Sequence, residues 1–138
     1  MRINIIQGPN LNMLGSREPE HYGNENLDSI NEKIVKNFPE IDFEFFQSNS
    51  EADIINHIHQ LKADYIVINP AAFTHTSVAI RDAIKSINIK FYEVHLSNVY
   101  AREEFRHKSF FSDIAEAVIC GLGSDGYIAA INHIINHS

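Results

Sequence analysis

The chain has 138 residues, one cysteine and a formal net charge of −7 at pH 7, with 11 basic residues against 18 acidic ones. This length predicts a single domain, residues 1–138, which can bury a hydrophobic core without a disulfide or a structural metal. The charge argues against nucleic acid as a partner, and no stretch has the apolar length of a membrane span or signal peptide, so we expect a soluble cytoplasmic protein.

The first half of the chain alternates between strand and helix patterns. Ile3–Ile6 is continuously apolar, as in a strand that is covered on both faces. Apolar residues then recur at helical spacing over 27–38, and Pro39 ends this helix. A second strand is predicted at 41–46. Ser50 opens a second helix with a capping-box sequence, and its inner face is predicted to be Ile54, Ile58 and Leu61.

The second half repeats this alternation. Strands are predicted at 65–68, at 89–94 and through Val118 and Ile119. The helices between and after them have inner faces predicted at Ile80, Ala83, Ile84 and Ile87, and at Ile128, Ile131 and Ile135. Five strands alternating with helices predict an α/β fold with a parallel, doubly wound sheet and helices on both faces. Ligands of such sheets bind beyond the carboxyl ends of the strands, so the loops after strands one, three and four should converge.

The stretch from Gly8 to Gly23 is too long and too polar to be a simple connection. It contains an amide at Asn10, a permanent cation at Arg17 and a phenol at Tyr22, between glycines and prolines that give it bends and hinges. We predict an active-site lid.

Two residue types are interpreted as structurally ordinary. Cys120 lies in an apolar run and is predicted to be a buried, inert thiol. The remaining histidines are predicted to lie on solvated faces, because those on one helix do not share a direction that would bind a metal; they are His57, His59, His107, His133 and His137.

Several long motifs occur in a characteristic order. They are Gly8-Pro9-Asn10-Leu11-Asn12-Met13-Leu14-Gly15, Arg17-Glu18-Pro19, Tyr22-Gly23, Asn69-Pro70, Thr74-His75-Thr76-Ser77, Glu93-Val94-His95-Leu96-Ser97-Asn98, Arg102-Glu103-Glu104-Phe105-Arg106, Gly121-Leu122-Gly123 and Gly126-Tyr127. With these motifs the chain resembles type II 3-dehydroquinate dehydratase. The resemblance implies a flavodoxin-like fold, a homododecamer built from trimers, and removal of water from 3-dehydroquinate by trans elimination in the shikimate pathway, without metal or organic cofactor.

The resemblance assigns proton abstraction next to the ketone to Tyr22. Lowering a tyrosine pKa by about 3 units requires about 4 kcal/mol of preference for the phenolate. A cation at about 4 Å in a medium of effective dielectric about 20 supplies a similar amount before desolvation. Arg17 is the candidate, because its charge cannot be lost to the phenolate.

The resemblance also assigns the other two catalytic functions. Asn10 stabilises the enolate through a bound water, and His95 protonates the leaving hydroxyl. Glu93 and His95 are two apart on a predicted strand, so they project to the same side, where the carboxylate can orient the imidazole and favour its charged form.

The remaining assignments concern substrate binding. Asn69 and the backbone of Leu96 and Ser97 match the positions that hold the carboxylate, and the hydroxyls are assigned to His75, Asp82 and Arg106. One departure is Ala71-Ala72, where family members commonly have a glycine. If this turn needs a positive φ, alanine is penalised there.

Two other classes of protein fit parts of the pattern. A nucleotide-binding or flavin-binding module would need a glycine-rich phosphate loop after the first strand, which Gly8-Pro9-Asn10 does not provide. A metal-dependent hydrolase would use His75 and His95, and metal analysis of the purified protein would distinguish it from a cofactor-free lyase.

Overall fold

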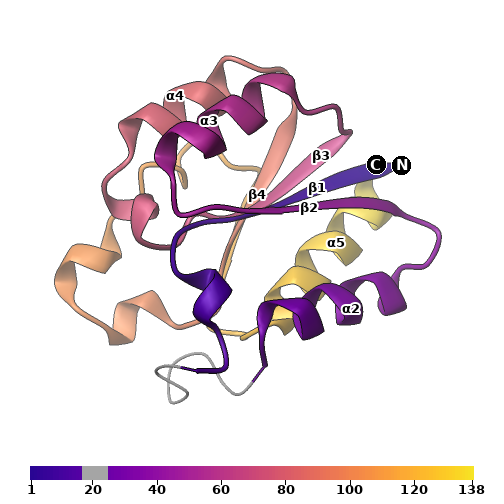
Figure 1. Ribbon diagram of the computed structural model, residues 1–138, viewed down its shortest axis with the longest axis horizontal. Coiled ribbons are helices and arrows are strands. Elements are labelled where there is room, and N and C mark those ends of the chain that lie inside the picture. Colours follow the sequence, from indigo (N-terminus) through magenta and orange to yellow (C-terminus); the bar gives the residue numbers. More distant parts are fainter. Residues whose placement is uncertain (17–24) are drawn as a thin grey trace.

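Five parallel strands form the centre of the computed structural model, which describes residues 1–16 and 25–138 (Figure 1). The strands are β1 (Arg2–Gln7), β2 (Asp42–Gln47), β3 (Tyr65–Asn69), β4 (Lys90–His95) and β5 (Ala117–Cys120). Their order in the sheet is β2-β1-β3-β4-β5. This is the flavodoxin-like order, in which the strand order reverses between β1 and β3, and it confirms the predicted doubly wound sheet.

Helices cover both faces of the sheet. The α-helices are α2 (Leu27–Asn37), α3 (Glu51–Gln60), α4 (Val78–Lys85) and α5 (Asp125–His137). Short 3-10 helices, η1 (Leu11–Met13), η2 (Ala71–His75), η3 (Val99–Ala101) and η4 (Glu104–His107), lie in the connections. Figure 1 shows α3 and α4 on one face and α2 and α5 on the other. Among the described residues, no helix is long and apolar enough to span a membrane.

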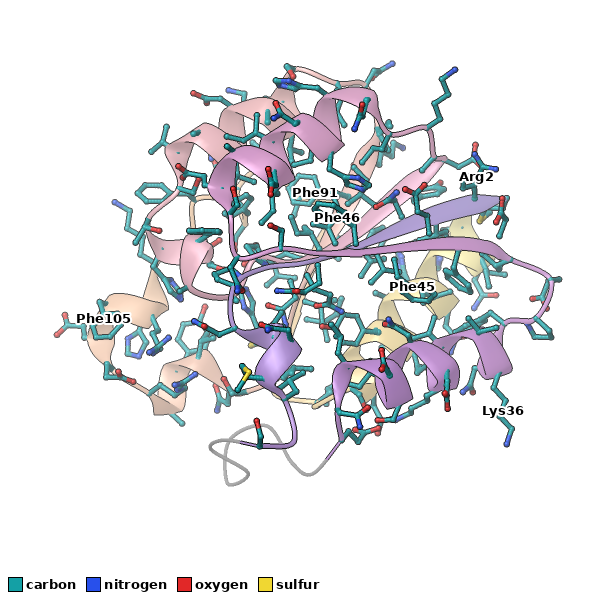
Figure 2. All side chains as sticks on the ribbon, in the orientation of Figure 1. Arg2, Lys36, Phe45, Phe46, Phe91 and Phe105 are labelled. Carbon is teal, nitrogen blue, oxygen red and sulfur yellow. The ribbon has the colours of Figure 1, made fainter. Side chains whose placement is uncertain are left out.

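Each face of the sheet has its own hydrophobic core. Ile3 and Ile5 of β1 pack towards α2 and α5, whereas Ile6 packs towards α3 and α4. This alternation follows from the two-residue period of a strand. Figure 2 shows the same division at Phe45 and Phe46, neighbours in β2 that point to opposite faces.

The strand predictions were accurate to one residue, and two details of the predicted core are corrected. Strands β2 and β4 begin and end one residue later than expected. The inner face of α5 is Tyr127, Ala130, Ile131 and Ile134, whereas Ile128 and Ile135 are only half-buried. Cys120 is also only half-buried, since β5 is an edge strand with a neighbour on one side alone.

The prediction that His57 lies on a solvated face is wrong. Its exposed fraction is 8%, its Nε2 lies 2.9 Å from Oδ1 of Asn4, and its ring stacks on Phe46 at a centroid distance of 4.0 Å. His57 is three residues after Ile54, so it shares the buried stripe of α3. The buried amide of Asn4 in β1 supplies the polar partner that makes this burial tolerable. His59, His107, His133 and His137 are exposed, as predicted.

Candidate active site

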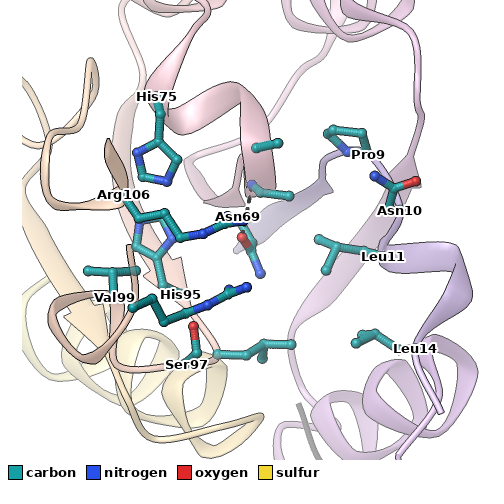
Figure 3. Close-up of a pocket in the computed structure, with 14 residues that line it drawn as sticks. Pro9, Asn10, Leu11, Leu14, Asn69, His75, His95, Ser97, Val99 and Arg106 are labelled. Atoms are coloured by element: carbon teal, nitrogen blue, oxygen red, sulfur yellow. Dashed lines mark hydrogen bonds between the residues drawn. The ribbon is translucent and has the colours of Figure 1, made fainter. Parts of the chain in front are cut away.

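A pocket opens beyond the carboxyl ends of β1, β3 and β4, where the sequence predicted that the polar loops converge (Figure 3). Seven of the predicted site residues line it: Asn10, Asn69, His75, His95, Leu96, Ser97 and Arg106. Glu93 lies behind the pocket wall and contacts His95. Asp82 is exposed on α4 and does not line this pocket. Arg17 and Tyr22 lie outside the described residues.

His95 and Glu93 form a buried pair at the end of β4. His95 Nε2 lies 2.5 Å from a carboxylate oxygen of Glu93, whose exposed fraction is 1%. Burial alone would raise the pKa of the Glu93 carboxyl, but hydrogen bonds from His95, Ser112 and Ser109 hold this pKa below its ordinary value. Glu93 is therefore an anion that orients the imidazole. Nδ1 of His95 has no hydrogen-bond partner among the described residues, which leaves it available to a ligand.

Asn69 is fixed by contacts on both sides of its amide group. Its Oδ1 accepts a hydrogen bond from the backbone N–H of Ala71 at 3.1 Å, and its Nδ2 donates to the Tyr127 hydroxyl at 3.2 Å. The Tyr127 hydroxyl donates in turn to Gln7 at 2.7 Å, and burial raises the pKa of Tyr127 to about 12. These bonds set which end of the Asn69 amide is the donor, so a second N–H remains for a ligand.

The turn after Asn69 requires an unusual backbone conformation. Ala71 has φ of 53°, in the left-handed region that favours glycine. The predicted penalty at this alanine is therefore present, and the hydrogen bond from Ala71 to Asn69 holds the turn. Close packing also restricts Gly8, because a Cβ there would lie 2.2 Å from the carbonyl oxygen of Pro70. The loops after β1 and β3 thus meet backbone to backbone, with the Gly8 N–H donating to the Asn69 carbonyl at 2.8 Å.

Asn10 opens the short helix η1 on the other side of the pocket. It has φ of 69°, a conformation that asparagine tolerates better than most residues, and its backbone N–H donates to Asn49 at 2.9 Å. The Asn10 side chain has no hydrogen-bond partner among the described residues, so it can bind a water or a ligand oxygen. Leu11 and Leu14 supply an apolar wall beside it (Figure 3).

The opposite wall supplies a histidine and two cations. His75 donates from Nδ1 to the carbonyl of Lys108 at 2.7 Å, and burial lowers the pKa of its imidazole. Nε2 of the neutral ring has no hydrogen-bond partner in the described parts of the chain and can accept from a ligand. Arg106 is hydrogen-bonded to Glu103 at 3.0 Å. Arg102 also lines the pocket, and the exposed fraction of its side chain is only 10%.

Arg102 was missed as a site residue, although it lies in the quoted motif four residues before Arg106. With Arg102 and Arg106 in one small cavity, the pocket is suited to an anionic, hydroxylated ligand.

Residues 1–16 and 25–138 contain no group of three or more His, Cys, Asp or Glu side chains arranged to hold a metal ion.

Comparison with known proteins agrees with this geometry. The model of the family described as Dehydroquinase class II matches residues 1–135. This chain belongs to the class II dehydroquinase family. The 3-dehydroquinate dehydratase of Shewanella woodyi is 58% identical over 98% of this chain and 92% of its own length, and that of Haemophilus influenzae is 58% identical over 91% and 87%. The crystal structure of the type II dehydroquinase from Butyrivibrio crossotus superimposes with a TM-score of 0.93, at 47% identity over 98% of this chain and 97% of that one.

Proposed function

We propose that this class II dehydroquinase removes water from 3-dehydroquinate to give 3-dehydroshikimate, with residues 1–138 acting as one catalytic domain. The observation that carries the proposal is the pocket in which His95, backed by the buried Glu93 carboxylate, faces Asn10, Asn69, His75 and Arg106. The names of the relatives give the same activity for those proteins.

The proposed reaction is a trans elimination through an enolate. Tyr22, with its phenol acidified by Arg17, takes the proton next to the ketone. Asn10 stabilises the enolate through a water. His95 then delivers a proton to the departing hydroxyl; its Nδ1 is the candidate donor atom, since Nε2 is engaged by Glu93. Every proton has a protein partner in this scheme, so it uses no cofactor.

Substrate binding is distributed over the pocket walls. The free N–H of Asn69 and the backbone of Leu96 and Ser97 hold the ring carboxylate, and His75 and Arg106 hold hydroxyls. Asp82 is exposed on α4, away from this pocket, so the hydroxyl contact proposed for it would be made in the pocket of a neighbouring subunit. This assignment goes with the proposed homododecamer built from trimers, with action in the cytoplasm and with a place in the shikimate pathway.

An ultraviolet assay for the conjugated enone product tests the activity directly. The purified chain should convert 3-dehydroquinate, and Tyr22→Phe should keep the fold but lose turnover by several orders of magnitude, because it deletes only the proton acceptor. Tyr100→Phe is the matched control, since Tyr100 is exposed and does not line the pocket. Absence of enone from the wild-type chain would refute the proposed function, and near-normal turnover in Tyr22→Phe would refute Tyr22 as the base.

A further inference from the structure

The Glu93 carboxylate accepts three hydrogen bonds, one from His95 and two from serines of a distant segment. Its Oε2 accepts from His95 Nε2 at 2.5 Å and from the Ser109 hydroxyl at 3.0 Å. Its Oε1 accepts from the Ser112 hydroxyl at 2.7 Å. A carboxylate offers about four acceptor sites, so this buried group is close to fully bonded. Both serines lie between η4 and β5, outside the pocket lining.

The direction of the Ser109 bond is fixed by the other contacts of its hydroxyl. Ser109 Oγ accepts from the backbone N–H of Phe111 at 2.9 Å and from that of Ser112 at 3.2 Å. These bonds occupy both of its acceptor positions, so its single proton points to Glu93 Oε2. Because Glu93 is a carboxylate and has no proton to donate, its short contact with His95 is a hydrogen bond donated by Nε2.

The segment that carries the serines is itself held rigidly. The Phe110 N–H donates to the Thr74 carbonyl at 2.9 Å, and Arg81 donates to the Phe110 carbonyl at 2.9 Å. Arg81 also makes a two-point ion pair with Asp113, and Phe111 is fully buried in the core beneath α4. The serine hydroxyls therefore face Glu93 from a fixed support, as a positioning function requires.

We propose that Ser109 and Ser112 are positioning residues of the dehydration site, which hold the Glu93 carboxylate so that His95 keeps one proton on Nε2 and the second proton of the charged imidazole lies on Nδ1, towards the substrate. This inference rests on the proposed function for its effect on catalysis. The serines touch no substrate and act through Glu93, and Glu93 acts through His95. Without them the carboxylate could rotate or accept a proton, and the imidazole would lose its single tautomer.

The inference predicts a change in pH dependence with a definite sign. The ionisable groups around the pair are His75 from η2 and Arg102 and Arg106 from the segment after β4, while Arg81 and Asp113 lie on the far side of the serine segment. Removal of a serine donor leaves these groups unchanged and makes the carboxylate easier to protonate. The acidic limb of the kcat profile, where Glu93 loses its charge, therefore moves to higher pH.

Ser112→Ala is the sharpest test, since the Ser112 hydroxyl makes only the bond to Glu93 among the described residues. We expect kcat to fall about 10-fold or more, the range for a hydrogen bond to a charged group, with little change in KM. Ser112→Thr keeps a hydroxyl and should recover most of the loss. Ser86→Ala is the matched control, because the Ser86 hydroxyl bonds the Ala83 carbonyl at the end of α4, away from the pocket.

A measurement without substrate separates this inference from the proposed function. Nitrogen NMR of histidine-labelled protein, at a pH where the His95 imidazole is neutral and with His95→Gln for assignment, should show a single Nε2–H tautomer in the wild type and a mixture in the Ser109→Ala/Ser112→Ala double variant. A wild-type chain that makes no enone yet shows this change would refute the function and keep the serine inference. An Nδ1–H tautomer of the neutral His95 ring in the wild type would overturn the inference. A Ser112→Ala variant whose kcat and whose acidic limb of the kcat–pH profile both match the wild type would also overturn it.

Discussion

The side-chain amide of Asn69 donates a hydrogen bond to the phenol oxygen of Tyr127, 3.2 Å away, and so links a pocket residue to the buried face of α5. Tyr127 is fully buried, and its hydroxyl donates a hydrogen bond to Gln7 at the end of β1. The orientation of a pocket-lining amide thus depends on a hydroxyl inside the core.

Tyr127→Phe should therefore weaken substrate binding more than it slows turnover. The ring still fills the core, but Asn69 loses the contact that orients its amide, so we expect KM to rise by about 10-fold with a smaller effect on kcat. Unfolding should become easier by about 1–3 kcal/mol, because a buried donor of Asn69 loses its partner. Tyr65→Phe is the control, since the Tyr65 hydroxyl has no hydrogen-bond partner among the described residues. A selective loss of kcat with unchanged KM would contradict this role.

Ala71→Gly should stabilise the protein. Alanine at φ of 53° is strained, and the left-handed conformation costs about 1–2 kcal/mol that glycine does not incur. Glycine also loses more backbone entropy on folding, so the expected net gain in unfolding free energy is about 0.5–1 kcal/mol by urea denaturation. Ala72→Gly, an exposed neighbour without a positive φ, should instead destabilise. Equal effects of the two substitutions would show that strain at Ala71 is negligible.

Stability should decrease in mildly acidic solution partly because of His57. Burial lowers the pKa of His57 below its ordinary value of 6.5, against a smaller opposing effect of Glu44. The unfolded chain therefore binds a proton more readily, and stability is lost as the pH falls through 6.5 towards the folded pKa. His57→Gln, which removes the titrating group, should flatten the pH dependence of unfolding free energy in this window. His59→Gln, on the exposed side of α3, should leave the slope unchanged.

Incubation with substrate and borohydride should leave activity and protein mass unchanged. An imine mechanism needs a neutral lysine in the site, and all six lysines fall within the described parts of the chain without lining the pocket. Lys33 is paired with Asp125 at 2.6 Å, and Lys108 is exposed next to Phe110. A substrate-dependent mass gain on any lysine would overturn the enolate mechanism.

The sequence predicted the fold well because the core follows simple periodicities. Continuous apolar runs such as Ile3–Ile6 became buried strands, and the inner faces predicted for α3 and α4 were largely correct. Seven pocket residues were found through the motifs that carry the family resemblance. The possible penalty at Ala71 was also identified, since a turn that prefers glycine has a physical reason to do so.

The contacts that were missed join residues that are far apart in the sequence. Asn69 and Tyr127 are separated by 58 positions, and Asn4 and His57 by 53. Helical spacing from Ile54 places His57 on the buried face of α3, but the sequence does not reveal that Asn4 supplies a polar partner there. Periodicity likewise gives no reason to connect Ser109 with Glu93. Such contacts are determined by the docking of whole layers.

The position of β1 between β2 and β3 has a consequence for the order of folding. The backbone of Arg2 at the start of β1 bonds Asp64, 62 positions later, and its side chain reaches Asp42, 40 positions later. Both strands that pair with β1 lie far along the chain, so β1 must wait for large loops to close, which slows folding. Since the Gly8–Asn69 contact that joins two walls of the pocket lies just beyond this pairing, refolding experiments should recover helical signal well before activity.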